Sequence, residues 1–478
     1  MRSTPLSLIA HWAGGELHGE DAVIDAVSND TRTLAAGSLY VALRGERFDG
    51  HDFAADAAAR GASALLVDHL LDAVELPQLL VADTERALAR IAAGLQRDRA
   101  TKVFAITGSN GKTSVKTLLL AILQHAAAHS GAVVHASPGN RNNEIGLPLA
   151  VIAAPDEADF AVYEMGAGKP GDIAYLTDIA RPDYALVNNI APAHLERLGS
   201  LLGVARTKGA IYAALPAEGV AAINADDAFG LWFEQNLAAR PPQGRRVLRF
   251  ALQASAEVHV RQLQLDAQGS RFVLVAPQGE AAVTLALPGR HNVLNALAAA
   301  SLALAAGIGL EQVAAGLAQA RPVPGRQVAR TLPSGEVLID DSYNANPGSL
   351  AAAIDALAAG GGENWLVLGD MRELGAEAQA LHAAAGRRAR EAGIARLYAL
   401  GPLSAAAAQA FGEGGRVFDS HAALAQALQA DIDERRAGAG PAEESTPLHV
   451  LVKGSRGSAM DRIVSALLAR AEETPNAA

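Results

Sequence analysis

The segment 107–114 has the residue types and spacing of a loop that binds phosphate. It reads Thr-Gly-Ser-Asn-Gly-Lys-Thr-Ser, and it joins the short apolar run 103–106 to a segment with helical apolar periodicity. A strand, a glycine-rich turn and a helix N-terminus in this order direct successive backbone N–H groups towards an anion. Lys112 is expected to reach the β- and γ-phosphates of ATP, and the Thr113 hydroxyl to bind Mg²⁺.

The loop is shorter than the usual pattern, because two residues separate its glycines whereas that pattern has four. A tight strand-to-helix turn without a ligand is therefore the alternative interpretation. The predicted nucleotide contacts are Gly108, Ser109, Asn110, Gly111, Lys112, Thr113 and Ser114.

Eight further motifs stand in order along the chain. They are the segments 142–148, 163–167, 193–196, 205–208, 289–296, 324–326, 340–347 and 452–456. Together with the short loop, this ordered set resembles the Mur ligase superfamily over nearly the whole chain. The resemblance implies a three-domain α/β fold and an ATP-dependent ligase that forms an amide bond through an acyl phosphate.

Within that family, three C-terminal runs are most similar to one kind of member. The segments 340–347, 368–371 and 453–456 resemble members that add D-alanyl-D-alanine to UDP-N-acetylmuramoyl-tripeptide. The segments 28–32 and 44–51 resemble the UDP-sugar domain of those members. The resemblance thus implies a role in peptidoglycan synthesis and, through it, in cell shape and cell division.

The resemblance also implies a site for two Mg²⁺ ions. It makes Glu164, at the end of an apolar run, a ligand together with Thr113, and it makes His194 a ligand of the second ion. Lys208 resembles the lysine that carries a carbamate, since an unprotonated amine can add CO₂ and become an anion. The predicted catalytic residues are Lys112, Glu164, His194 and Lys208, and the predicted metal ligands are Thr113, Glu164, His194 and Lys208. The alternative interpretations are a solvated carboxylate at a strand end for Glu164, a structural histidine for His194 and a surface lysine for Lys208.

Four residues of the later motifs are predicted to hold the nucleotide. Asn292 and Asn295 are three residues apart on a predicted helix, so they share a face, and their amides suit the adenine edge. Helix capping is the alternative for Asn292. Arg326 follows a rigid Pro-Gly and is expected to reach phosphate. Asp341 resembles the acidic residue that binds the ATP ribose.

The predicted substrate contacts fall into two groups. Those expected to bind the UDP-sugar are Ser28, Asp30, Thr31, Arg32, Arg44, Asp49, Gly50 and His51. Those expected near the reacting groups are Asn142, Asn143, Tyr343, Asn344, Asn346, Lys453, Ser455 and Arg456. The alternative for the first group is loop turns with solvated charges. For the residues at 343, 344 and 346 it is an Asx turn before a proline.

The elements that must position these residues alternate along most of the chain. Strands are predicted over 38–43, 64–67, 103–106, 160–164, 184–187, 219–223, 337–340, 365–368, 397–400 and 450–452. Helices are predicted over 53–61, 84–99 with a threonine N-cap, 114–125 and 289–306. Alternating strands and helices indicate parallel sheets covered on both faces. The segment 247–287 has alternating patterns that predict a separate, smaller antiparallel sheet.

These elements predict three α/β domains. They are a small UDP-muramyl substrate domain over 1–83, a P-loop ATPase-like parallel sheet over 84–322, and a Rossmann-like doubly wound ligase domain over 323–478. The last boundary lies at a Pro- and Gly-rich turn.

The composition limits the class of protein. A net charge of −11 argues against a basic nucleic-acid-binding surface, and the absence of cysteine excludes disulfides and thiolate metal sites. No uninterrupted apolar run of about 18 residues occurs, and the first 18 residues lack the pattern of a signal peptide. A cytoplasmic protein is expected, acting as a monomer on small-molecule substrates, with no nucleic acid and no membrane span.

Three other functions remain open from the residues. Another amide ligase of the superfamily, such as a folylpolyglutamate synthase, shares most motifs, although the N-terminal segments argue against it. A P-loop kinase or NTPase needs only the loop, Mg²⁺ and an acceptor site. A nucleotide-binding scaffold needs no catalysis at all.

Overall fold

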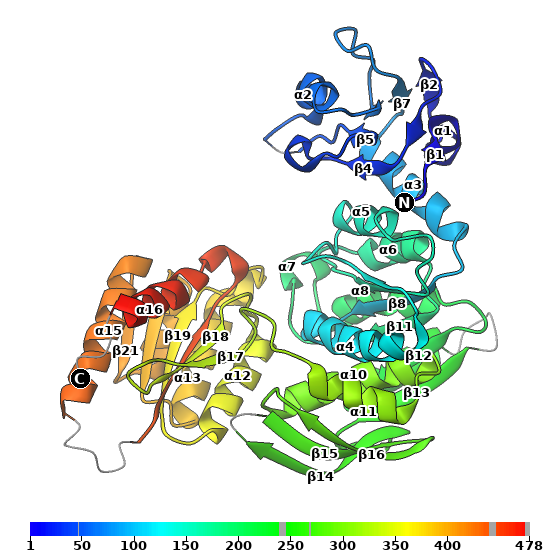
Figure 1. Ribbon diagram of the computed structural model, residues 1–478. Helices are drawn as coiled ribbons and strands as arrows, with labels where there is room; N and C mark the ends of the chain where they lie inside the picture. The colour runs from blue at the N-terminus through cyan, green and yellow to red at the C-terminus, as the bar shows by residue number, and fades with distance from the viewer. Residues whose placement is uncertain (46, 239–244, 267–268, 439–445, 474–478) are drawn as a thin grey trace.

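The computed structural model describes every residue except 46, 239–244, 267–268, 439–445 and 474–478. The fold is α/β, as predicted, with three large sheets that each take their strands from one continuous part of the chain (Figure 1). The sheets with the helices that cover them are termed the N-terminal, central and C-terminal units. Among the described helices, none combines the length and apolar character needed to cross a membrane.

The N-terminal unit is a small mixed sheet in the order β2-β7-β6-β5-β4, in which β2 runs antiparallel to β7 and the other pairs are parallel. Its strands are β2 (Glu16–His18), β4 (Ala26–Ser28), β5 (Ser38–Val41), β6 (Ala64–Val67) and β7 (Gln78–Leu80), while β1 (Thr4–Pro5) and β3 (Val23–Ile24) pair as a separate two-stranded antiparallel sheet. Its helices are α1 (Leu6–Ala13), η1 (Thr31–Thr33), η2 (Gly50–Phe53) and α2 (Ala54–Ala59). The strands and helix predicted within this unit are confirmed.

Helix α3 (Thr84–Arg97) connects the N-terminal unit to the central one. Its buried side chains belong to one apolar core that both units share. The predicted threonine N-cap is wrong. Asp83 has the extended backbone of a cap (φ −157°), and its carboxylate accepts the Arg86 N–H at 2.9 Å. Thr84 already lies in the helix, and its hydroxyl donates to Ala42 O instead.

The central unit contains a nine-stranded sheet in the order β16-β15-β14-β13-β12-β11-β8-β10-β9. Its strands are β8 (Lys102–Thr107), β9 (Val134–Ala136), β10 (Phe160–Glu164), β11 (Tyr184–Val187), β12 (Val220–Asn224), β13 (Arg246–Ala251), β14 (Val258–Asp266), β15 (Gly269–Ala276) and β16 (Gly279–Leu285). The prediction of a separate sheet over 247–287 is wrong. β13 pairs in parallel with β12, so the antiparallel strands β14 to β16 continue the same sheet and cover an edge that would otherwise expose unpaired backbone groups.

Helices cover both faces of the central sheet, as the alternation of its buried residues requires. One face packs on α4 (Lys112–Ser130), α10 (Arg290–Ala305) and α11 (Leu310–Gln319). The other packs on α5 (Gly146–Ile152), α6 (Asp172–Ala180) and α8 (Leu201–Ala213). The remaining helices are α7 (Leu195–Leu198), α9 (Gly230–Phe233) and η3 (Glu234–Ala238).

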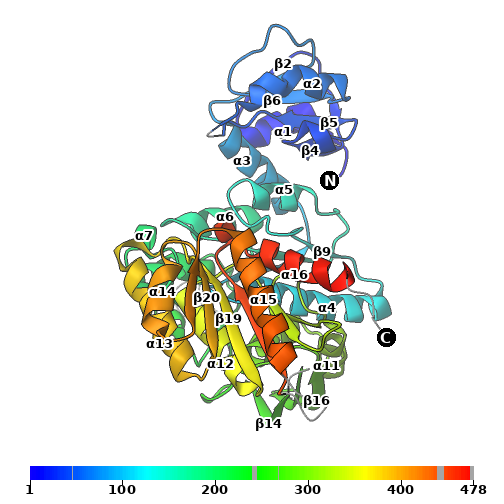
Figure 2. The ribbon, with the colours of Figure 1, turned by 90° about the vertical axis from the view of Figure 1, so that its left-hand side faces the viewer.

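The C-terminal unit is a doubly wound sheet in the order β17-β18-β22-β19-β20-β21, parallel except for the edge strand β17. Its strands are β17 (Val328–Thr331), β18 (Val337–Asp341), β19 (Glu363–Gly369), β20 (Arg396–Leu400), β21 (Gly415–Phe418) and β22 (Leu448–Lys453). One face packs on α12 (Pro347–Ala359), α13 (Ala378–Glu391) and α14 (Ser404–Phe411), and the other on α15 (His421–Gly438) and α16 (Asp461–Glu473) (Figure 2). The single-turn helices are η4 (Gly375–Glu377) and η5 (Arg456–Ser458).

Candidate active site

A cavity of about 730 Å³ lies between the central and C-terminal units. It is bounded by the carboxyl ends of parallel strands from both sheets, which is where doubly wound folds bind ligands. The predicted residues that line it are Ser109, Asn110, Gly111, Lys112, Thr113, Ser114, Asn142, Asn143, Glu164, His194, Asn292, Asn295, Arg326, Asp341, Tyr343, Asn344, Asn346, Lys453 and Arg456. Of the residues predicted in these two units, Gly108, Lys208 and Ser455 lie outside the lining.

The glycine loop forms the floor of this cavity. Gly111 has φ of +78° and is the N-cap of α4, which begins at Lys112. A Cβ atom at Gly111 would lie 2.4 Å from Asn188 Nδ2, so glycine is required by space as well as by backbone conformation. Lys112 Nζ donates to Gly108 O at 2.9 Å. Burial lowers the pKa of Lys112, and nearby Glu164 opposes this shift.

Two asparagines that follow β11 hold the loop in place. Asn189 Oδ1 accepts the Asn110 N–H at 2.9 Å, and Asn188 Nδ2 donates to Asn110 O at 3.0 Å. Asn188 Nδ2 also donates to Asn295 Oδ1 at 2.9 Å, which links the loop to α10. Neither asparagine was predicted from the sequence. The signal was available, because two amides directly after a buried strand reach the same sheet edge as the loop.

Glu164 is buried, with 3% of its side chain exposed, so the alternative of a solvated carboxylate is wrong. It accepts hydrogen bonds from Thr113 Oγ1 at 2.8 Å and from Asn142 Nδ2 at 2.9 Å. Burial alone would raise the pKa of Glu164, but Lys112 and Lys116 hold it below its usual value. Lys116 was missed, although it lies one helical turn after Lys112 and therefore on the same face.

Arg326 joins the C-terminal unit to the glycine loop. Its Nη2 donates to Thr113 Oγ1 at 2.9 Å, and its guanidinium lies 4.3 Å from the centre of the Tyr343 ring. Arg456 approaches the same ring at 5.5 Å. The residue predicted to contact phosphate thus lies beside the glycine loop.

Asp341 and Lys453 form a buried ion pair at 2.6 Å, at the ends of β18 and β22. The two residues are partners in the register of these parallel strands. Lys453 Nζ also donates to Asn344 O at 3.0 Å. The predicted ribose carboxylate and the predicted substrate lysine are therefore neighbours in one wall of the cavity.

Three of the predicted asparagines also fix the local backbone, although the capping alternative for Asn292 is wrong, because the N-cap of α10 is Gly289 and no side chain caps it. Asn346 Oδ1 accepts the Ser349 N–H and caps α12, while its Nδ2 donates to Asn110 Oδ1 at 2.6 Å. Asn143 Oδ1 accepts the N–H of Gly146 at the start of α5, and Asn292 Nδ2 donates to the backbone before α10. These side chains fix local turns and line the cavity at the same time.

Ser455 differs from its prediction as a substrate contact. It is buried, its hydroxyl donates to Ala345 O at 3.1 Å, and the same hydroxyl accepts the Arg372 N–H at 2.9 Å. Both partners of this hydroxyl are backbone groups, and Ser455 is outside the cavity lining, so its hydroxyl does not face the cavity. It braces two loops that carry site residues.

His194 lines the cavity, whereas Lys208 lies outside its lining. His194 is half-buried with φ of +53°, and its Nδ1 contacts the carboxylate of Glu373 in the C-terminal unit. Burial lowers the pKa of His194. Lys208 on α8 is fully buried, so the surface-lysine alternative is wrong. Burial, together with the charge of Lys112, holds the pKa of Lys208 well below its usual value.

The predicted UDP-sugar residues lie in the N-terminal unit, and the lining of the described cavity does not include them. Asp30 caps η1 and pairs with Arg32 at 2.7 Å, and this hydrogen bond lowers the pKa of Asp30 to about 2. Ser28 Oγ bonds the backbone of Asp30. Thr31 helps to hold the pKa of Asp56 below its usual value. The turn alternative is therefore correct for the local structure of this segment.

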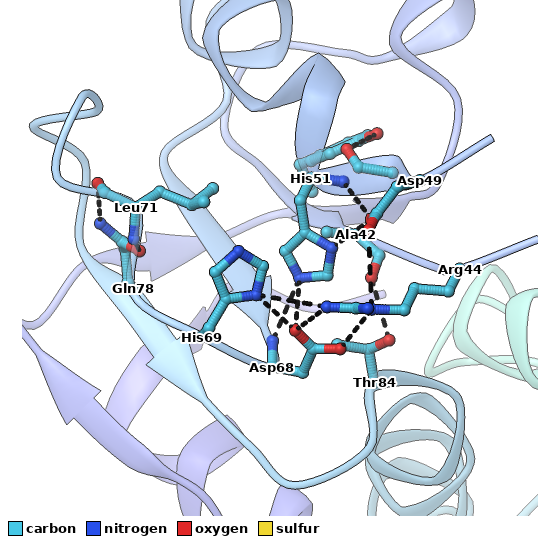
Figure 3. A network of polar contacts seen from close by, with 11 residues as sticks. Ala42, Arg44, Asp49, His51, Asp68, His69, Leu71, Gln78 and Thr84 are labelled. Atoms are coloured by element: carbon cyan, nitrogen blue, oxygen red, sulfur yellow. Dashed lines mark hydrogen bonds and ion pairs between the residues drawn. The ribbon is translucent and has the colours of Figure 1, made fainter.

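The other N-terminal group forms the network of Figure 3. His51 is buried, its Nδ1 contacts Asp49 Oδ1 at 2.5 Å, and its Nε2 accepts the Asp68 N–H. Arg44 pairs with the Asp68 carboxylate at 2.7 Å. Atoms of His51, Asp68 and His69 lie close enough together to hold a metal. The guanidinium of Arg44 already supplies the cation there, so the network is better explained as hydrogen bonding than as metal ligation.

Backbone packing fixes Gly50 within this network. A Cβ atom there would lie 2.6 Å from Leu43 N, and Gly50 O accepts the Tyr40 hydroxyl at 3.0 Å. The tight turn sets the direction in which the following histidine enters the network.

The fold and the site define a nucleotide-binding α/β enzyme whose cavity is shared by two units. Three family descriptions match the chain: "Mur ligase family, catalytic domain" over 23–95, "Mur ligase middle domain" over 106–303, and "Mur ligase, glutamate ligase domain" over 326–456. The chain belongs to the Mur ligase family.

Individual relatives agree over the full length. The chain is 43% identical to the UDP-N-acetylmuramoyl-tripeptide--D-alanyl-D-alanine ligase of Escherichia coli (strain K12), covering 98% of this chain and 99% of that one. A Haemophilus influenzae relative with the same name is 37% identical over 94% of each chain. The crystal structure of MurF from Acinetobacter baumannii matches with a TM-score of 0.89 and 32% identity, covering 98% of this chain and 100% of that one.

A structure with bound nucleotide is also similar. MurF ligase from Thermotoga maritima in complex with ADP has a TM-score of 0.79 and 25% identity, over 94% of this chain and 98% of that one. A folylpolyglutamate synthase from Mycobacterium tuberculosis is 19% identical with a TM-score of 0.64, which shows a shared fold alone.

Proposed function

We propose that this chain joins D-alanyl-D-alanine to UDP-N-acetylmuramoyl-tripeptide, with ATP as the energy source, in the synthesis of peptidoglycan precursors. The chain is a ligase and uses ATP. The observation that carries the proposal is the shared cavity, in which a phosphate loop and a buried carboxylate of one unit face Arg326 and Lys453 of another. Full-length identity to enzymes with this activity in their names supports the choice of substrates.

The reaction must turn a carboxylate into an electrophile. An oxygen of the tripeptide carboxylate attacks the γ-phosphorus of ATP, and the bond between that phosphorus and ADP breaks. The free amine of the dipeptide then attacks the acyl carbon, and phosphate leaves as the amide forms. The first step brings two anions together, so fixed cations lower its barrier. Lys112 of the central unit and Arg326 of the C-terminal unit both line the cavity and would supply these cations.

The glycine loop binds the phosphates through its backbone N–H groups. The amides of Asn292 and Asn295 on α10 suit the adenine edge, and Asp341 suits the ribose hydroxyls. Lys453 pairs with Asp341 at 2.6 Å, and its charge offsets that of the carboxylate in this buried wall. The cavity residues Tyr343, Asn344 and Arg456 are left to contact the two amino-acid substrates.

The donor atoms on the loop side fit Mg²⁺. Thr113 offers a hydroxyl and Glu164 a carboxylate that is held ionised, and both are the oxygen ligands that Mg²⁺ prefers. Bound there, the ion would neutralise charge on the transferred phosphate. Asn142 and Lys116 keep the carboxylate of Glu164 turned towards the loop.

A second ion needs a further anion near His194. Lys208 as an amine does not ligate Mg²⁺, but as a carbamate it does. A neutral amine adds CO₂, which forms an N–C bond and releases one proton. Burial lowers the pKa of the Lys208 amine well below its usual value, which favours the neutral state that this addition needs. The carbamate on Lys208 and the second ion are therefore part of the proposal.

We infer that the chain works as three domains, over 1–83, 84–322 and 323–478. The N-terminal segments that contain Asp30, Arg32, Arg44 and His51 would hold the UDP-sugar, while the peptide end extends into the shared cavity. The cytoplasmic location and the monomeric state remain predictions from the sequence.

Phosphate release across a panel of substrates tests this proposal. Purified full-length protein is given ATP, Mg²⁺ and UDP-N-acetylmuramoyl-tripeptide with either meso-diaminopimelate or lysine as the third residue. Each is paired with D-Ala-D-Ala, L-Ala-L-Ala or no dipeptide. Release that depends on both the tripeptide and D-Ala-D-Ala, with an amide product by mass spectrometry, is expected. A phosphorylated product without an amide, or release without the dipeptide, would refute the proposal.

A further inference from the structure

A loop of the C-terminal unit meets the central unit where α7 begins. The carboxylate of Glu373, a few residues after β19, contacts Nδ1 of His194. Beside this contact, Gly375 packs on the backbone of Glu196, where an added Cβ would lie 3.5 Å from the Glu196 Cα. Figure 1 shows α7 on the edge of the central unit that faces the C-terminal unit. The contact between the two units therefore includes backbone packing as well as the pairing of the Glu373 and His194 side chains.

Both partners have backbone conformations that side chains disfavour. The φ angle is +53° at His194 and +62° at Glu373. Each such conformation costs on the order of 1 kcal/mol for a residue other than glycine, and it persists where its surroundings fix it. Strain of this kind is concentrated at functional sites. Its presence on both sides of one contact indicates that the contact geometry matters.

The loop before Glu373 is held firmly by its own unit. The Met371 N–H donates to His382 Nε2 at 2.9 Å, and the Arg372 N–H donates to Ser455 Oγ at 2.9 Å. Met371 itself is fully buried. Glu373 therefore moves with the C-terminal unit as a whole, while His194 belongs to the central unit.

We propose that Glu373 is the positioning residue for His194, and that it orients this imidazole for metal binding when the C-terminal unit is docked. The inference rests on the metal role of His194 in the proposed function. A neutral imidazole has one N–H, so a carboxylate that accepts it at Nδ1 leaves the Nε2 lone pair available for a cation. Carboxylates in this outer position fix the ring and strengthen the ligand.

The position of the pair couples site assembly to domain docking. His194 lines the cavity, yet the group that orients its ring comes from the other unit. Separation of the units would free the ring to rotate and weaken the second metal site. The second metal site would then be complete in the docked arrangement, where Arg326 also contacts the glycine loop.

Manganese binding to the full-length protein tests this inference. Mn²⁺ is titrated into the complex with ADP and UDP-N-acetylmuramoyl-tripeptide, and free Mn²⁺ is followed by electron paramagnetic resonance. Glu373→Gln keeps the size of the side chain but replaces the charged acceptor by a weaker one. We expect it to weaken one class of Mn²⁺ site by about 10- to 100-fold. Raised metal concentration should restore kcat in this variant.

Two matched variants separate the possible results. Glu377→Gln, on the exposed η4 turn of the same loop, should bind Mn²⁺ as the wild type does. His194→Ala should lose the weakened class of site altogether. If His194→Ala loses that site and Glu373→Gln keeps wild-type affinity, the positioning role is refuted and the proposed function stands. If His194→Ala leaves Mn²⁺ binding unchanged, the metal role of His194 itself is wrong.

Discussion

Arg326 of the C-terminal unit donates a 2.9 Å hydrogen bond to the hydroxyl of Thr113 in the central unit. The bond links the first turn of α4 to a segment that precedes the C-terminal sheet. Thr113 at the same time donates to Glu164 at 2.8 Å, so one hydroxyl joins a cation and an anion from different units. The Arg326 guanidinium also lies against the ring of Tyr343, and this contact fixes the orientation of the guanidinium plane.

We expect Arg326→Lys to lower kcat by about 100-fold while the protein stays folded. Lysine keeps the positive charge but lacks the planar guanidinium group and its contact with the aromatic ring. Steady-state ADP release measures the effect, and circular dichroism checks the fold. Arg330→Lys, an exposed change on the edge strand β17, is the matched control. Equal activity of the two variants would show that catalysis does not need the planar guanidinium group of Arg326.

Glu164→Gln should lower kcat by about 100-fold or more and raise the Mg²⁺ concentration needed for half-maximal activity. The amide keeps the shape of the side chain but removes the negative charge between Lys112 and Lys116. Initial rates over a Mg²⁺ series measure both quantities. Glu157→Gln, at an exposed position before β10, serves as the control. An unchanged Mg²⁺ dependence in Glu164→Gln would remove this carboxylate from the metal site.

The features of the site that depend on residues close together in the chain could be predicted from the sequence. The glycine loop, residues 108–111, lies between a strand and a helix, and the short apolar runs are strands at close to their predicted bounds. The resemblance of ordered motifs added the roles of distant residues such as Lys208. Local pattern alone could not distinguish its buried position from a surface one.

The remaining features depend on contacts between distant segments. The pairing of Asp341 with Lys453 requires β22 to lie beside β18, although β19, β20 and β21 separate them along the chain. The pairing of β13 with β12, which extends the central sheet, likewise depends on the tertiary arrangement that leaves the edge of β12 unpaired. The contact between Glu373 and His194 joins two loops without a shared motif. Periodicity and spacing carry no information on such pairings.

Breaking the ion pair of Asp341 and Lys453 on one side should destabilise the C-terminal unit. Asp341→Asn or Lys453→Met each leaves a buried charge without its partner, at a cost of about 3–5 kcal/mol. The double variant should lose less than the sum of the two single variants. Urea unfolding followed by the fluorescence of Trp365 in this sheet measures the differences. Strict additivity would show that the two charges do not stabilise each other.

His382 gives the loop before Glu373 a dependence on pH. Its ring is buried, Nε2 accepts the Met371 N–H at 2.9 Å, and Nδ1 donates to Ala378 O at 2.6 Å. Burial lowers the pKa of His382, although the bond to Ala378 and the charge of Asp370 oppose this. Protonation would place a second donor opposite the Met371 N–H, so the folded state favours the neutral ring.

The sign of the effect follows from proton binding. Below an ordinary histidine pKa of about 6.5, the unfolded segment binds a proton that the folded one does not. The stabilisation by neutral His382 is therefore complete above that pH and decreases as the pH falls towards the lowered pKa, by at most about 1.4 kcal/mol per pH unit. His382→Gln can form both hydrogen bonds without titrating. Hydrogen exchange of residues 370–374, corrected for intrinsic rates, should accelerate between pH 7.5 and 5.5 in the wild type and much less in the variant. The same acceleration in both proteins would show that this histidine does not control the loop.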